Sequence, residues 1–195
     1  ESYDEEPDRR YPVMYMFDGH NVFFDEDATF GKSWGMNDYM ERTGKQLIIV
    51  GVECNHQGNC RLSEYSPVTF ENAELGKIRG RGSTTMNWMV NELKPYIDEH
   101  FRTLPDRRNT ILAGSSMGGL MALYGATAYN SVFQRAACLS PSLWVAPGKV
   151  MELIARARIR PDTTIYMDYG ENEMANHVAS QAVIPSAVYL LLTKE

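Results

Sequence analysis

The sequence predicts a three-layer α/β fold, in which helices cover both faces of a mainly parallel central sheet. Residues 12–17 and 47–52 are continuous apolar runs, which are typical of strands buried on both faces, and we expect both to be central strands. Further strands are predicted at residues 110–113, 135–139 and 164–167, each preceded by a helix or a helix-like segment. This alternation indicates a parallel sheet with right-handed crossovers.

Three helices have recognisable signals. Residues 34–43 are predicted to form a short helix that ends at Gly44, because glycine suits the position after a helix. Within residues 87–101, apolar residues recur every four positions, which predicts an amphipathic helix packed on the sheet and kinked at Pro95. Residues 184–192 are predicted to form a last helix.

Length and composition fit one domain. The chain has 195 residues, of which 44% are hydrophobic, so residues 1–195 can bury a sizeable core as a single domain. No apolar run approaches the roughly 18 residues that a membrane span needs. The net charge of -6 opposes binding to nucleic acid or to an anionic membrane. We therefore expect neither a nucleic acid nor a membrane as partner, and the sequence leaves the oligomeric state open.

The cysteines and histidines do not indicate a disulfide framework or a metal site. The cysteines are Cys54, Cys60 and Cys138. Their odd number and lack of paired spacing favour a reducing compartment and hence a cytoplasmic location, although a single bridge between the first two stays open. Secretion is the alternative location, because the N-terminus looks truncated. The histidines are His20, His56, His100 and His177. They are dispersed along the chain, so we expect no zinc site, and no metal or other cofactor is implied.

The most informative motif is Gly114-Ser115-Ser116-Met117-Gly118, which has the pattern G-x-S-x-G. It directly follows the predicted strand at residues 110–113 and directly precedes a helical pattern at residues 117–128, which is the context of a nucleophile elbow. A nucleophilic serine must be exposed and must lie beside a backbone N–H that can meet an oxyanion, and this turn supplies both. Ser116 is therefore the candidate nucleophile, and the alternative is a glycine-rich turn without chemistry.

Four motifs, in this order, resemble one known family. They are YPVMYMFDGHN at residues 11–21, EYSP at 64–67, GSSMGGL at 114–120 and LSPSLW at 139–144. Together they resemble the putative-esterase family of α/β hydrolases, which includes esterase D, feruloyl and acetyl-xylan esterases, siderophore esterases and mycolyltransferases. The resemblance extends from about Tyr11 to Glu173. It implies a three-layer α/β-hydrolase domain with a serine nucleophile.

The resemblance also implies an oxyanion hole and one wall of a pocket. The loop after residues 12–17 leaves a strand end where open α/β sheets bind ligands. In the family this loop gives one oxyanion donor, which maps onto the N–H of His20, and the N–H of Met117 is the other. The alternative for His20 is a hydrogen-bonded loop histidine. Trp144 is expected to line the acyl or alcohol pocket, and the alternative is that it is a core tryptophan.

The acid of the catalytic triad is expected in the loop after residues 164–167, because in this fold the chain order is Ser, then Asp or Glu, then His. The resemblance maps it onto Glu173, three residues after the glycine that ends this strand. Glu171 and Asp168 are the alternatives, together with a merely solvated acidic loop. No histidine of the chain stands where the family has its base, and His177 would need an unusual loop to reach Ser116.

Further strands are implied by the resemblance on both sides of this region. Relatives have a hairpin before the strand at residues 12–17, and a strand and the catalytic histidine after the acid. We therefore expect that the edge strands of the sheet are missing from residues 1–195 and that the domain is incomplete at both termini. The predicted function is a serine carboxylic-ester hydrolase that forms an acyl-enzyme on Ser116. The alternatives are an acyltransferase of the same fold and a catalytically silent binding module.

Overall fold

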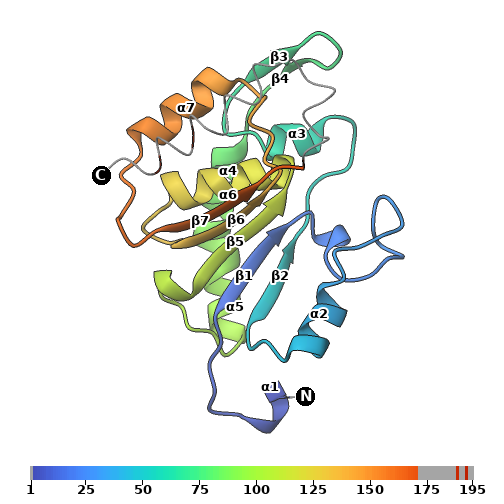
Figure 1. The fold of residues 1–195 in the computed structure, drawn as a ribbon, viewed down its shortest axis with the longest axis vertical. Helices are drawn as coiled ribbons and strands as arrows, with labels where there is room; N and C mark the ends of the chain where they lie inside the picture. The colour runs from blue at the N-terminus through green and yellow to red at the C-terminus, as the bar shows by residue number, and fades with distance from the viewer. Residues whose placement is uncertain (1, 171–187, 189–191, 193–195) are drawn as a thin grey trace.

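The computed structural model describes residues 2–170, 188 and 192, and five strands within them form one parallel sheet (Figure 1). The order across the sheet is β2-β1-β5-β6-β7. The strands are β1 (Val13–Phe17), β2 (Ile48–Val52), β5 (Thr110–Ser115), β6 (Arg135–Leu139) and β7 (Thr164–Asp168). All four pairings between neighbours are parallel, so every strand ends at the same edge of the sheet. The predicted α/β-hydrolase fold is confirmed.

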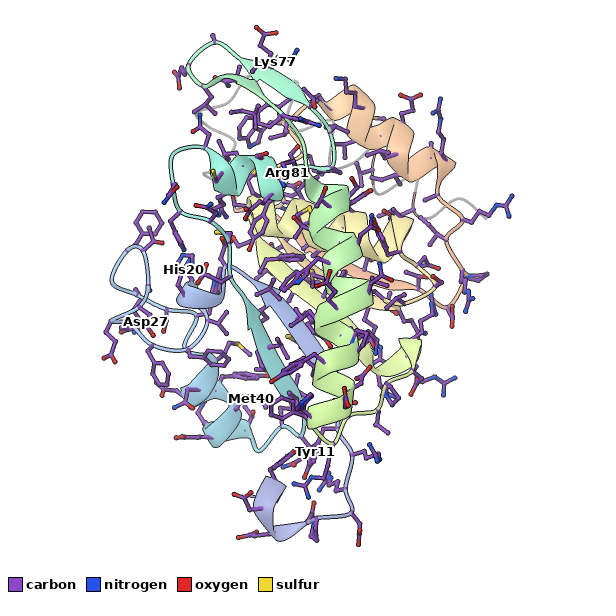
Figure 2. The ribbon with its side chains drawn as sticks, turned by 180° about the vertical axis from the view of Figure 1, so that it is seen from behind. Tyr11, His20, Asp27, Met40, Lys77 and Arg81 are labelled. Atoms are coloured by element: carbon purple, nitrogen blue, oxygen red, sulfur yellow. The ribbon has the colours of Figure 1, made fainter. Side chains whose placement is uncertain are left out.

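Helices cover the sheet on both faces. The longer ones are α2 (Met36–Thr43), α4 (Gly82–Trp88), α5 (Lys94–His100), α6 (Met117–Ala128) and α7 (Pro147–Arg156). Figure 2 shows α4 and α5 in front of the sheet when the molecule is seen from behind. Short helices lie at α1 (Ser2–Glu5) and α3 (Cys60–Glu64), and 3₁₀ turns at Gly19–Asn21 and Arg107–Asn109. Outside the sheet, β3 (Phe70–Asn72) and β4 (Gly76–Ile78) form an antiparallel hairpin.

Two cores lie on opposite faces of the sheet, because successive residues of a strand point to opposite sides. Val13, Tyr15 and Phe17 of β1 belong to the larger core, together with apolar side chains of α4, α5, α6 and α7. Met16 belongs to a smaller core, against which Met36 of α2 packs. The larger core is closed by α6, which is buried along most of its length. This helix starts at the candidate nucleophile, so core packing fixes its position.

The predicted strand at residues 47–52 is present as β2. Among the described residues β2 pairs with β1 and with no other strand, so it lies at the edge of the described sheet, and its central position stays a prediction. Its apolar run is explained by packing: Ile48 and Val50 pack on the larger core, and Ile49 packs on the smaller one. Such a run reports that both faces are covered, and it does not report pairing at both edges.

The predicted end of the first helix and the predicted excursion from the sheet are present, and the predicted kink takes another form. Gly44 ends α2 with a φ of 61°, a conformation that glycine adopts without strain. The predicted kink at Pro95 is instead a π-helical segment, Met89–Leu93, directly before α5. A widened turn at that point accommodates a proline that lacks an N–H. Residues 55–83 leave the main sheet as expected.

Three other expectations concern a disulfide bridge, a last helix and a membrane span. All three cysteines are free thiols, so the Cys54–Cys60 bridge is not formed. The helix predicted at residues 184–192 falls outside the described residues, apart from Val188 and Leu192, which are helical. None of the described helices is long and apolar enough to cross a membrane.

Replacing Gly119 by alanine should destabilise the fold. A Cβ at Gly119 of α6 would lie 2.9 Å from the carbonyl oxygen of Leu139 and 3.1 Å from Cα of Pro141, and main-chain atoms there cannot easily move. We expect Gly119→Ala to lower the free energy of unfolding by about 1–3 kcal/mol. In the matched control, Gly148→Ala in α7, the new Cβ meets nothing within 4 Å. That variant should be neutral or more stable by up to about 1 kcal/mol in urea unfolding. Equal effects of the two substitutions would contradict this account.

Candidate active site

Ser116 lies at the turn between β5 and α6 in a backbone conformation that side chains rarely adopt, with φ 56° and ψ -118°. Three main-chain hydrogen bonds hold it there. Ser116 N–H donates to the carbonyl of Leu139 at 3.0 Å, and the Ser116 carbonyl accepts from the N–H of Ser142 at 2.9 Å and of Leu120 at 3.0 Å. Strain of this kind persists only where the surroundings fix the backbone, and it is typical of functional sites. The side chain of Ser116 is exposed, as a nucleophile requires.

The glycines on either side of Ser116 are required by close packing. A Cβ at Gly114 would lie 2.5 Å from the carbonyl carbon of Gly118, and a Cβ at Gly118 would lie 2.9 Å from Cβ of Phe17. Both distances are far below ordinary van der Waals contact. The strand, the turn and the first turn of α6 therefore approach each other as closely as a nucleophile elbow demands.

The hydroxyl of Ser116 has a partner that the sequence analysis did not assign. Ser116 Oγ and Ser142 Oγ are 3.1 Å apart, and either hydroxyl can donate. Ser142 also donates its N–H to the Ser116 carbonyl, so the loop after β6 is tied to the elbow at two points. The only signal for Ser142 in the sequence was its place in the motif at residues 139–144, which gave it no role.

A cavity of about 580 Å³ opens beside Ser116. Its walls come from the loops at the carboxyl ends of β1, β2 and β5, and from the loop before α2. The lining residues are Asp18, His20, Asn21, Thr29, Phe30, Lys32, Ser33, Trp34, His56, Gly58, Arg61, Ser115 and Ser116. Trp144 is not among them: it is partly exposed, and the edge of its ring meets Phe70. Its role as a pocket wall stays a prediction.

Asp18 and Arg61, which both line the cavity, form an ion pair. Asp18, which is 4% exposed, accepts hydrogen bonds from Arg61 Nε at 2.6 Å and Nη2 at 2.8 Å. These hydrogen bonds raise the pKa of Arg61. The N–H of Asp18 donates to the hydroxyl of Tyr65, which donates in turn to the carbonyl of Val52. The motif at residues 64–67 thus supports the loop after β1, which positions His20.

The predicted oxyanion donors differ in their surroundings. Met117 is the first residue of α6, where a backbone N–H has no carbonyl within the helix to bond. The N–H of His20 donates to Glu53 Oε2 at 2.9 Å, so a carboxylate occupies the position where the oxyanion was expected. This contact fits the alternative of a hydrogen-bonded loop histidine as well. The assignment of both donors stays a prediction.

Glu53 follows β2 and was not singled out by the sequence analysis. Partial burial raises the pKa of this carboxyl, but hydrogen bonds from the N–H of Cys54 and from the rings of His20 and His56 outweigh it and lower the pKa to about 2. Glu53 Oε1 lies 2.8 Å from His20 Nδ1 and 3.0 Å from His56 Nε2. The sequence spacing was misleading here: these two histidines, 36 positions apart in the chain, have ring centroids only 4.5 Å apart.

The remaining triad residues fall largely outside the described residues. Glu173, its alternative Glu171, and His177 all lie there, so their assignments stay predictions. Asp168 is described: its Oδ1 accepts from the N–H of Ser140 and its Oδ2 from the hydroxyl of Tyr166, each at 3.1 Å. Among the described residues no histidine ring is hydrogen-bonded to Ser116.

Removing Arg61 should destabilise the protein strongly, because the buried carboxylate of Asp18 would lose its counter-charge. We expect Arg61→Leu to lower the free energy of unfolding by about 3 kcal/mol. Adding Asp18→Asn should recover part of that loss, since no buried charge is then unpaired. Arg156→Leu, which breaks an exposed pair with Glu152, should hardly change the midpoint of urea unfolding. A midpoint for Arg61→Leu like that of the wild type would contradict this view of Asp18.

The low pKa of Glu53 makes a pH-dependent contribution to stability. A carboxyl whose pKa is lowered in the folded state stabilises that state above its ordinary pKa, and this contribution is lost as the pH falls through the folded value. The stability difference between the wild type and Glu53→Gln should therefore be full at neutral pH and shrink between about pH 4.5 and pH 2. Denaturant unfolding at several pH values measures it. A difference that grows on acidification would be evidence against the lowered pKa.

The known proteins similar to this chain include esterases and an uncharacterized protein. The family model described as "Putative esterase" matches residues 1–187. Uncharacterized protein YbbA of Bacillus subtilis is 22% identical over 166 residues, which cover 84% of this chain and 62% of that protein. Esterase Rv1288 of Mycobacterium tuberculosis is 30% identical over 128 residues, covering 66% of this chain and 25% of that protein.

Solved structures show the same fold. An IroE-like serine hydrolase from Shewanella oneidensis superposes with a TM-score of 0.75 at 20% identity, covering 99% of this chain and 62% of that one. A ferulic acid esterase superposes with a TM-score of 0.67 at 17% identity, covering 100% of this chain and 78% of that one. This chain thus spans about three fifths of the length of the first relative and of the first structure. Since the family model matches nearly the whole of it, the chain belongs to the putative-esterase family of α/β hydrolases.

Proposed function

We propose that this chain carries the nucleophile of a carboxylic-ester hydrolase, and that Ser116 forms the acyl-enzyme. The observation that carries the proposal is the backbone of Ser116, which is held at φ 56° between β5 and α6 with its side chain exposed to a cavity of about 580 Å³. A Gly-rich turn without chemistry would have no need to hold a non-glycine residue in this conformation. Membership of the esterase family supports the same conclusion.

The proposed reaction proceeds in two halves. Ser116 Oγ attacks the ester carbonyl carbon while its proton passes to a general base, and the tetrahedral intermediate then expels the alcohol, which takes up a proton. Water attacks the acyl-enzyme in the second half and releases the acid. The N–H groups of Met117 and His20 would hold the oxyanion in both halves. For His20 this requires that the carboxylate of Glu53, which accepts that N–H in the present structure, turns away when substrate binds.

The acid and base of the triad belong to the proposal as well. Glu173 would orient the catalytic base and stabilise its imidazolium. We assign the base to none of the described histidines. The substrate class is a small-molecule ester, and the cytoplasmic location stays a prediction.

Two other functions are compatible with the fold. In an acyltransferase an alcohol would replace water in the second half-reaction, and in a binding module Ser116 would not react. Product analysis with and without an added acceptor alcohol separates the first from a hydrolase, because only a transferase would convert most of the acyl groups into a new ester. Reactivity of Ser116 toward a fluorophosphonate separates both enzymes from the binding module, because only an activated serine reacts with that probe.

Substitution of two neighbouring serines, Ser115 and Ser116, tests which one is the nucleophile, because both line the cavity. In an enzyme that also contains the triad base, Ser116→Ala should lower kcat for p-nitrophenyl acetate by up to about 10⁶-fold, because a triad loses nearly all of its rate advantage with the nucleophile. Ser115→Ala is the matched control and should keep most of the activity, since this residue ends β5 and does not occupy the strained position. Circular dichroism checks that both variants fold. Loss of activity in Ser115→Ala alone would overturn the assignment.

The acid is tested by three substitutions that each remove one carboxylate. Glu173→Gln should reduce kcat severely, though less than Ser116→Ala does, because the nucleophile and the oxyanion hole would survive. Glu171→Gln and Asp168→Asn should retain most of the activity. If one of these two loses activity while Glu173→Gln does not, the triad acid is that residue instead.

A further inference from the structure

Three side chains of metal-binding type converge beyond the carboxyl ends of β1 and β2. His20 lies in the 3₁₀ turn after β1, Glu53 directly follows β2, and His56 comes three residues later. The atoms His20 Nδ1, Glu53 Oε1 and His56 Nε2 all lie within 4.8 Å of one another. Figure 2 shows His20 beside the chain that leaves β2. His20 and His56 also line the cavity that contains Ser116.

We propose that His20, Glu53 and His56 bind a divalent transition-metal ion, with Zn²⁺ as the best fit, at the wall of this cavity. Two imidazole nitrogens and one carboxylate oxygen are a donor set that zinc favours, and they leave one coordination position for water or another ligand. The acyl-enzyme chemistry proposed for Ser116 needs no metal, so this site would be an additional property of the chain.

The spacing of the donor atoms fits such an ion after a small adjustment. In a tetrahedral zinc site with bonds of about 2.0–2.2 Å, neighbouring donor atoms lie about 3.3 Å apart. Glu53 Oε1 is now 2.8 Å from His20 Nδ1 and 3.0 Å from His56 Nε2. These two contacts would open by up to about half an ångström, and the nitrogens of His20 and His56, which lie within 4.8 Å of each other, would settle at the same spacing. The side chains of Glu53 and His56 are about half exposed, so both have room to turn.

The hydrogen bonds around the cluster suit both the metal-free and the metal-bound form. An ionised carboxylate can only accept, so the two ring nitrogens that face Glu53 carry protons in the metal-free form. A metal ion can bind these nitrogens when each neutral ring shifts its proton to its other nitrogen. His20 Nε2 lies 2.9 Å from Thr29 Oγ1. Because a hydroxyl can donate or accept, this hydrogen bond persists when the proton of His20 moves from Nδ1 to Nε2. The N–H of Cys54 holds Glu53 Oε1 at 2.8 Å in the same way.

The neighbouring thiol does not compete as a ligand. Cys54 is buried, and its Sγ lies 3.8 Å from Asp18 Oδ1 and is not part of the cluster. The other explanation of the cluster is a set of hydrogen bonds that only ties the loop after β1 to the loop after β2. Both explanations fit the observed distances, and they differ in whether the cluster binds a metal ion.

Calorimetric titration of the chelator-treated protein with ZnCl₂ tests the proposal. We expect one ion per chain, and with CoCl₂ a visible spectrum typical of nitrogen and oxygen ligands, without thiolate charge transfer. His56→Ala and Glu53→Gln should each weaken zinc binding by at least about 10-fold, and Thr29→Val, which removes a hydrogen bond to a ligand, by about 10-fold. His100→Ala is the matched control, because its ring bonds to the carbonyl of Tyr96.

Two results would overturn the proposal. One is the absence of stoichiometric zinc binding by the wild type, and the other is equal affinity in the wild type, His56→Ala and Glu53→Gln, which would place the ion elsewhere. Circular dichroism confirms that each variant folds. Since the readout is metal affinity, failure here leaves the esterase proposal standing, and loss of activity in Ser116→Ala leaves this one standing.

Discussion

The close approach of α6 to the carboxyl ends of β5 and β6 is the constraint on which the candidate site depends. At Gly114, Gly118 and Gly119 there is no space for a Cβ, so the helix begins directly against the strands. This contact leaves Ser116 in a strained conformation, and the hydrogen bond to Leu139 and the two contacts with Ser142 hold it there. The large core beneath α6 offsets the strain. Fold stability and the exposure of Ser116 thus have one physical origin.

The loops around the elbow are held by charge as well as by packing. Asp18 is buried and pairs with the partly buried Arg61, and the hydroxyl of Tyr65 hydrogen-bonds the main chain of Asp18 and of Val52. The loop after β1 therefore carries His20 on a rigid support, while Glu53 in the loop after β2 remains half exposed. The His20 N–H is thus held in place, whereas the carboxylate of Glu53 can turn. Binding of substrate or of a metal ion can therefore change which group accepts the His20 N–H.

Much of the fold was predictable because its signals are local. The apolar runs gave the strands, the glycine pattern gave the elbow, and α6 and β6 have the expected ends. Contacts between distant segments were not predictable from one sequence. Sequence patterns do not show that Glu53 meets His20 and His56, or that Ser142 meets Ser116, since each contact arises only when parallel strands bring their loops to one edge.

The most direct test of the central claim is covalent labelling of the protein with a fluorophosphonate, followed by peptide mass spectrometry. An activated serine reacts with this probe, whereas an ordinary surface hydroxyl does not. The account predicts one adduct per chain, located on Ser116 and absent from Ser116→Ala. An adduct on Ser115, or no adduct on a folded protein that turns over esters, would contradict it.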